Sequence, residues 1–288
     1  MSVAIVTDST ASLPAELVAS RDIRVVPLHV VLGGQQYSEG IDVTTVELAA
    51  ALRKLIAVST SRPSPQAFLA VYEAAAAGGA TAVVSVHLSS DMSGTVGSAS
   101  LAAAQSPIPV EVVDSRSVGM AMGYAVLSAA SAASQGMDAK AVAAVASSRA
   151  RASTVIFYVD TLEHLRRGGR IGAASALLGS ALAIKPLLAL SDGHIDPIEK
   201  VRTAARALSR LEELALKAAD AAGARGVDIA VHHLDSRTRA GHLVDRLRKG
   251  LPSSASVMLV ELGAVVGAHV GPGTIAVAVS PRPPGGQD

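Results

Sequence analysis

The chain has 288 residues, of which 50% are hydrophobic and 17% charged, and its formal net charge is +1. This length is enough for one large domain or two modest ones with a well-buried core. The near-neutral charge, without a long basic run, argues against nucleic acid as a partner. The chain has no cysteine, which excludes disulfides, thiolate chemistry and zinc–sulfur sites and is typical of a cytoplasmic protein.

The beginning of the chain, MSVAIVTDST, has neither a basic flank nor a long apolar core, so it predicts a buried strand and not a signal peptide. Because polar residues interrupt every long apolar run, we expect no transmembrane helix and no stable membrane insertion. Aromatic residues are scarce, with two Phe, four Tyr and no Trp. An apolar pocket would therefore be lined by aliphatic side chains, which suit an alkyl chain better than a stacked base.

Short apolar runs alternate with helical patterns in the first half of the chain. The pattern predicts strands at 3–6, 25–32, 83–86 and 110–113, and helices at 44–56, 66–77, 118–134 and 138–151. Thr44 and Glu47 have the spacing of a capping box, and the segment 59–65 is expected to be a rigid polar loop. Alternation of this length predicts a mostly parallel sheet flanked by helices, with ligands beyond the carboxyl ends of its strands.

The pattern changes near residue 154 and predicts a second α/β unit with a mixed sheet. Its expected strands are 155–159, 187–190, 195–201, 227–232, 257–262 and 274–279, and its expected helices are 173–184, 202–222 and 239–249. Asp192 and Gly193 predict a hairpin turn between the second and third of these strands. We therefore expect an N-terminal domain over 1–152, a C-terminal domain over 153–280 and a disordered, proline- and glycine-rich tail over 281–288.

A candidate anion site follows the predicted strand at 82–86. The chain there enters a serine- and glycine-rich loop with Ser93 and Gly94, and a helix of small residues is expected from Thr95. Unpaired N–H groups at a helix start and the helix dipole both favour an anion. The alternative is that Ser93 only caps the helix and Gly94 only makes the turn.

Other candidate polar groups lie in loops. His269 stands in the glycine-rich segment 267–273, where it could donate a hydrogen bond to an anion or only to a backbone carbonyl. Arg170 follows two glycines and could meet a partner or form a local ion pair. Thr60 and Ser61 could cap the next helix or donate to a ligand.

The sequence lacks a phosphate-binding P-loop, a dinucleotide glycine fingerprint, a zinc-protease pair and an EF-hand loop. His232, His233 and Asp235 could ligate a metal. Because adjacent strand residues point to opposite faces, both histidines cannot easily reach one ion. We therefore expect no metal site.

Seven short motifs, taken together and in order, resemble the DegV family of bacterial fatty-acid-binding proteins, which includes the lipid-binding (FakB) subunits of fatty acid kinase. They are 8–14 (DSTASLP), 60–65 (TSRPSP), 88–95 (LSSDMSGT), 113–115 (VDS), 167–171 (RGGRI), 185–188 (KPLL) with 192–193 (DG), and 267–273 (GAHVGPG). They span nearly the whole chain.

The resemblance implies two α/β domains with a long-chain fatty acid in a tunnel between them. It places the carboxylate on Thr60, Ser61, the Ser93–Gly94 turn and His269. It also places Arg170 at the ligand mouth, where a kinase docks. Arg62 replaces the glutamine usual in its loop and could alter the charge at that mouth, and Val96 and Gly97 replace a bulkier pair.

The expected function is thus a fatty-acid carrier without a cofactor, which presents the carboxylate to a separate ATP-dependent fatty acid kinase for acyl-phosphate formation. One alternative is a hydrolase that uses Ser93 with His269, although no acidic partner for the histidine is evident. Another is a carrier of a different apolar carboxylate.

Overall fold

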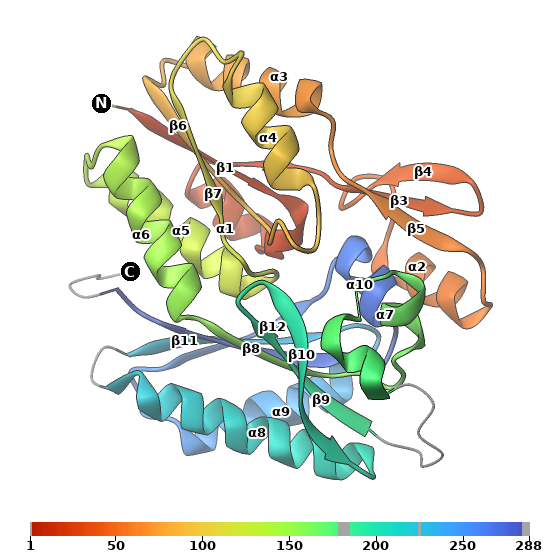
Figure 1. Cartoon of the computed structure of the whole chain (residues 1–288). Helices are drawn as coiled ribbons and strands as arrows, with labels where there is room; N and C mark the ends of the chain where they lie inside the picture. Colours follow the sequence, from red (N-terminus) through yellow and green to blue (C-terminus); the bar gives the residue numbers. More distant parts are fainter. Residues whose placement is uncertain (1, 178–184, 224–225, 284–288) are drawn as a thin grey trace.

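The computed structural model describes residues 2–177, 185–223 and 226–283. Its main layers are a parallel sheet with helices on both faces and a mixed sheet with two long helices on its outer face (Figure 1). This confirms the predicted α/β fold with one parallel and one mixed sheet.

The parallel sheet has the strand order β2-β1-β6-β7. Its strands are β1 (Val3–Asp8), β2 (Ile23–Val26), β6 (Ala82–His87) and β7 (Val110–Asp114). Its helices are α1 (Ala15–Ser20), α3 (Pro65–Ala77), α4 (Thr95–Ala103), α5 (Met120–Ser134) and α6 (Ala139–Ala152). Alternate strand residues face opposite sides. Val6 and Val83 pack with α3 and α4, whereas Ile5 and Val84 belong to the core with α5 and α6.

The mixed sheet has the order β10-β9-β8-β13-β11-β12, in which only β11 and β12 are parallel. Its strands are β8 (Thr154–Tyr158), β9 (Lys185–Ser191), β10 (His194–Val201), β11 (Val227–His233), β12 (Ser256–Glu261) and β13 (Ile275–Pro281). Helices α8 (Ala204–Ala221) and α9 (Arg237–Gly250) cover one face. Met120 and Tyr124 of α5 pack on the other face, so α5 lies between the two sheets.

A third sheet, which the sequence pattern did not predict, has the order β4-β3-β5. It consists of β3 (His29–Leu32), β4 (Gln35–Ser38) and β5 (Val58–Ser61), and α2 (Thr45–Arg53) lies between β4 and β5 in the chain. Both α2 and this sheet contact α10 (Ala264–Val270) from the other half of the chain. Helix α7 (Glu163–Arg167) lies on α10 as well. The short sheet and α10 thus bring distant segments together (Figure 1).

Several local predictions are confirmed. The Thr44 hydroxyl accepts from the Glu47 N–H at 3.2 Å while the Glu47 carboxylate accepts from the Thr44 N–H at 2.9 Å, which completes the capping box. The hairpin of β9 and β10 turns at Asp192 and Gly193, both with positive φ.

Other local predictions are wrong. The run 25–32 is split by Pro27 into strands of two different sheets, the expected loop at 59–65 begins as strand β5, and His269 lies on helix α10 and not in a loop. The expected helix at 173–184 starts as a 3₁₀ turn at Gly172–Leu177, and 178–184 lie outside the described residues.

The prediction of a disordered tail from residue 281 onwards is wrong at its start. Pro281 is the last residue of β13, and the Arg282 guanidinium donates to Asp228 at 2.6 Å. Residues 284–288 lie outside the described part of the chain. The domain boundary near residue 152 stays a prediction.

Candidate functional site

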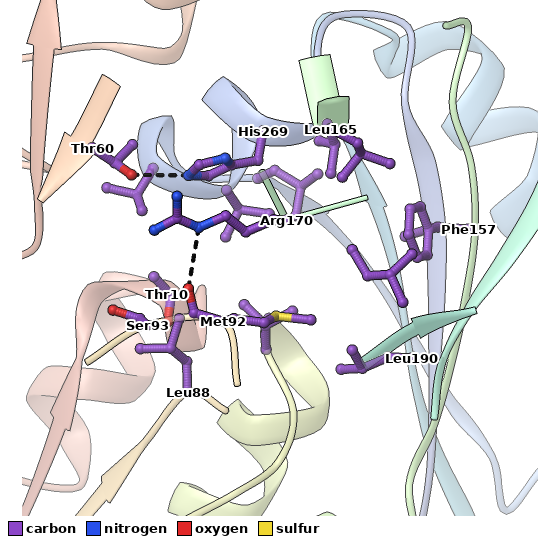
Figure 2. A pocket seen from close by; sticks show the side chains of 18 of the residues that line it. Thr10, Thr60, Leu88, Met92, Ser93, Phe157, Leu165, Arg170, Leu190 and His269 are labelled. Carbon is purple, nitrogen blue, oxygen red and sulfur yellow. Dashed lines mark hydrogen bonds between the residues drawn. The ribbon is translucent and has the colours of Figure 1, made fainter. Parts of the chain in front are cut away.

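An apolar cavity lies between the loops of the parallel sheet and the inner face of the mixed sheet (Figure 2). The empty space within it, together with its opening to solvent, is about 930 Å³. Most of its wall is aliphatic, as the composition suggested: Leu28, Leu88, Val118, Val155, Leu165, Leu190, Ile195, Leu262, Val265, Val266, Val270 and Ala276, with Phe157 and Met92. Such a wall favours an elongated hydrocarbon ligand.

One end of the cavity is polar because β5 and α10 meet there. The Thr60 hydroxyl and His269 Nε2 lie 2.9 Å apart, although 209 residues separate them in the chain. Figure 2 shows this pair across the cavity from Phe157 and Leu190. The two groups form one hydrogen-bonded unit at the cavity wall.

Burial keeps the imidazole of His269 neutral. Desolvation, with a smaller contribution from the nearby Arg170 guanidinium, lowers the pKa of His269 to about 4. Within the described residues, His269 Nδ1 is buried without a hydrogen-bond partner, and Gly168 packs directly against it with no room for a side chain. A neutral ring with a proton on Nε2 donates to Thr60, which leaves the Thr60 hydroxyl proton free for a ligand.

The serine loop supplies a second wall of the polar end. Ser93 lines the cavity, and its hydroxyl lies 2.8 Å from that of Thr95. Ser93 is not the helix cap, because α4 begins after Gly94 and has no side-chain cap. Gly94 is not among the cavity-lining residues. Instead, the Arg62 guanidinium packs over it and leaves no space for a Cβ, so the steric role of Gly94 is to admit Arg62.

Arg170 lies beside the polar end of the cavity and contacts the serine loop. Its Nε donates to the Met92 carbonyl at 3.2 Å and its Nη1 to the Gly168 carbonyl at 2.7 Å. These contacts fix the guanidinium beside the cavity (Figure 2). Arg170 also lines a neighbouring surface cleft, which shares Thr60 and His269 with the cavity.

All the polar side chains selected from the sequence therefore converge on one place. Thr60, Ser61, Arg62, Ser93, Arg170 and His269 line the cavity. The assignment of each side chain to a ligand atom stays a prediction.

Sequence reasoning did not select three polar residues that line the cavity, Thr10, His232 and Thr274. Thr10 is held by Asp8, whose Oδ1 accepts from the Thr10 N–H at 3.0 Å and whose Oδ2 lies 3.0 Å from His87 Nδ1. Thr10 lies in the motif DSTASLP, which directly follows the predicted first strand, so its position at a strand end could have indicated a place near the ligand. His232 was considered only as a metal ligand.

The hydrolase alternative finds no support in the hydrogen bonds. His269 Nε2 pairs with Thr60, and the Ser93 hydroxyl pairs with Thr95. A serine nucleophile needs its hydroxyl on the imidazole, with an acid on the other ring nitrogen. Among the described residues, His269 Nδ1 has no such partner.

The described residues contain no group of three or more metal-binding side chains. His232 lines the cavity, whereas His233 and Asp235 line a separate surface hollow. The two histidines therefore lie on different faces of β11, as the strand alternation predicted. Within the described part of the chain, no helix is long and apolar enough to span a bilayer.

Comparison with known proteins gives consistent matches over the whole chain. A family model described as "Uncharacterised protein, DegV family" matches residues 2–282. A DegV domain-containing protein of Streptomyces coelicolor is 52% identical over 97% of this chain and 99% of its own length. A relative of the same description from Mycobacterium tuberculosis is 37% identical over 97% of both chains.

Solved structures agree with these sequence matches. A structure described as fatty acid binding of a DegV family protein from Thermus thermophilus has a TM-score of 0.91 at 36% identity, covering 98% of this chain and 100% of that one. The structure of DegV from Bacillus subtilis, described as a fatty acid binding protein, has a TM-score of 0.89 at 31% identity with the same coverage.

Proposed function

The chain belongs to the DegV family, and from this premise we propose that it binds a long-chain fatty acid and presents the carboxylate to a separate ATP-dependent fatty acid kinase. The chain itself then acts as a carrier without a cofactor, and the bond-forming step takes place on the partner. Two related structures described as fatty acid binding support the first half of the proposal.

The observation that carries the proposal is an aliphatic cavity with hydroxyl donors at one end, of which the Thr60 hydroxyl is paired with the His269 imidazole. A carboxylate that leaves water needs several hydrogen bonds, because an unpaired buried charge costs several kcal/mol or more. Thr60, Ser61 and Ser93 supply hydroxyls, and the fixed guanidinium of Arg170 supplies positive charge beside them. The site is thus suited to a monoanion with a long apolar tail.

The tail provides most of the affinity. Each CH₂ removed from water contributes about 0.8 kcal/mol. Aliphatic lining residues such as Leu88 and Leu190 can bury the CH₂ groups of the tail. The hydroxyls at the polar end then determine the orientation of the bound acid.

Binding is tested with protein that has been stripped of lipid and then mixed with defined fatty acids. We expect a stoichiometric acid by mass spectrometry, and we expect Ser93→Ala and His269→Ala to weaken its binding. Val96→Ala, on the helix beyond the loop, serves as the matched control. No co-purifying acid and no uptake of any added acid contradict the proposal, and preferred uptake of a different apolar carboxylate identifies the alternative carrier.

The position of Arg170 supports the presentation step of the proposal. Arg170 lines both the cavity and the adjoining cleft, with Arg167 and His164 on the cleft side. We place Arg170 and Arg62 at the surface that the kinase meets. We propose a cytoplasmic location for this step, because ATP is available there.

The presentation step is tested by adding ATP and a fatty acid kinase catalytic subunit to the loaded protein and trapping acyl-phosphate with hydroxylamine. We expect product only when both proteins are present, and less product with Arg170→Met at equal loading. Product from the loaded chain and ATP alone contradicts the assignment of catalysis to the partner.

A further inference from the structure

The inference concerns the surface cleft that adjoins the polar end of the cavity, and it rests on the proposed function. Thr60, Arg170 and His269 line both spaces, so the cleft leads to the expected position of the carboxylate. Helices α2 and α7 both contact α10 beside it (Figure 1). The empty space within the cleft, together with its opening to solvent, is about 960 Å³. A partner that acts on the carboxylate therefore meets this cleft.

One wall of the cleft is apolar and comes from the end of α2, the turn after it and the start of β5. Its side chains are those of Leu52, Leu55, Ile56, Ala57 and Val58. Leu55 is 73% exposed and Ile56 is 43% exposed. Neither residue lines the cavity, so neither is needed to bury the tail of the acid. Adjacent exposed apolar side chains at a cleft are typical of a contact surface for another molecule.

The backbone at Leu55 makes the exposed leucine unusual. The Ile56 N–H donates to the Ala51 carbonyl at 3.0 Å, and the Leu55 N–H donates to the Leu52 carbonyl at 3.1 Å. These two bonds form a Schellman motif at the end of α2, in which Leu55 has a φ of 55°. Glycine is favoured at this position, because a side chain strains the left-handed backbone. The leucine therefore gains little within this chain and leaves its side chain available to another molecule.

The opposite wall is cationic and comes from α7 and the loop after it. His164, Arg167 and Arg170 line it. Glu163 pairs with both Arg166 and Arg167, which leaves one positive charge on these three side chains. Arg170 adds a second. None of the described residues that line the cleft is Asp or Glu. The cleft is thus complementary to an occupant with negative charge beside an apolar side chain.

We propose that this cleft is the docking site of the kinase catalytic subunit. An apolar side chain of the kinase packs against Leu55 and Ile56, and a neighbouring acidic side chain of the kinase pairs with Arg167. A few such anchors carry most of the binding energy of a protein interface. A hollow accepts a protruding protein segment, whereas the flat surface of a bilayer does not enter it.

The test measures how the rate of acyl-phosphate formation depends on the concentration of protein loaded with octadecanoic acid. ATP and a fatty acid kinase catalytic subunit are present, and hydroxylamine traps the product. We expect Leu55→Gly and Ile56→Ser to raise the KM for the loaded protein by about 5- to 30-fold and to leave kcat unchanged. Val46→Ser is the matched control, because Val46 lies on α2, is 74% exposed and does not line the cleft. Equal KM values in the unaltered protein and all three variants overturn the proposal.

Leu55→Gly separates docking from folding. Glycine suits the positive φ of residue 55, so the urea midpoint of this variant should rise. Its affinity for octadecanoic acid should stay unchanged, because Leu55 does not line the cavity. A more stable variant with a higher KM cannot be explained by misfolding. A loss of acid affinity in Leu55→Gly means that the turn serves loading, which overturns the proposal.

Arg167→Gln tests the charge of the occupant. We expect this variant to raise the KM at 0.1 M NaCl and to differ less from the unaltered protein at 0.5 M NaCl, because the Debye length falls from about 10 Å to about 4 Å. Arg167 does not line the cavity, so loading should be equal. A ratio of the two KM values that is the same at both salt concentrations overturns the pairing with an acidic side chain.

Uptake of octadecanoic acid from phosphatidylglycerol vesicles tests a lipid surface as the occupant. Slower uptake by Leu55→Gly, with an unchanged KM in the kinase reaction, shows that the cleft meets lipid and overturns the proposal. If the unaltered loaded protein gives no product with the kinase, the presentation step fails and the docking site fails with it. Product with equal KM values overturns the docking site alone and leaves the presentation step standing.

Discussion

Replacing Thr60 by valine removes one hydroxyl from the polar end of the cavity and keeps the β-branched shape that strand β5 favours. Two losses follow. His269 Nε2 loses its partner at 2.9 Å, and an unsatisfied buried group costs about 1–3 kcal/mol of stability. The bound carboxylate loses a hydrogen bond to a charged group, worth about 1.5–3 kcal/mol, so affinity should fall roughly 10- to 150-fold.

Both losses can be measured on lipid-free protein. Titration calorimetry with octadecanoic acid gives the affinity, and urea unfolding gives the stability. Ser59→Ala is the matched control, because Ser59 is the preceding residue of β5 and is not among the residues that line the cavity. Unchanged affinity in Thr60→Val would refute the assignment of this hydroxyl to the carboxylate, and unchanged stability would refute the hydrogen bond to His269.

Three further outcomes are expected. Across a series of saturated acids, affinity should rise about fourfold per CH₂ until the cavity is filled and then stop rising; a flat series measured by displacement of a fluorescent acid would show that the tail is not buried. Folding lowers the pKa values of His232 and His269 from 6.5 to about 4. Between pH 6.5 and 4 the unfolded chain therefore binds more protons than the folded chain. As the pH falls through this window, each histidine should lower the free energy of unfolding by up to about 1.4 kcal/mol per pH unit. Urea unfolding at several pH values checks this, and the dependence should be weaker in His232→Phe; equal slopes would contradict it. Gly168→Ala places a methyl group against His269 Nδ1 and should weaken acid binding in the same titration, whereas Gly97→Ala, with nothing within 4 Å of its added Cβ, should keep binding and raise stability by about 0.5–1 kcal/mol. Equal affinity of the two glycine variants would show that the Gly168 contact does not position His269.

The two main sheets were predictable because the strands and helices in each half of the chain follow a regular order. Alternating strands and helices before residue 150 indicated a parallel sheet, and the Asp192–Gly193 turn indicated the antiparallel hairpin after it. The third sheet was missed for a physical reason. Its strands are four residues each and half-exposed, so they carry no strong alternation, and their pairing is long-range.

The polar end of the cavity could be predicted only as a set of separate loops. The hydroxyls that follow strands and the histidine among glycines each indicated a possible anion-binding group. Only the family resemblance implied that these groups bind the same carboxylate. The sequence could not show that His269 lies on a helix or that it pairs with Thr60, because that contact depends on how α10 packs against β5. His232 was missed for the opposite reason: beside His233 it looks like a strand end, and only the register with Ala276 places it in the cavity.

The docking of the small sheet on α10 has a consequence for the order of events during synthesis. The codon for Thr60 is translated 209 residues before that for His269. The hydrogen-bonded pair at the polar end therefore forms only after α10 has been synthesised and has packed against β5. Until then the Thr60 side chain lacks the partner that orients its hydroxyl.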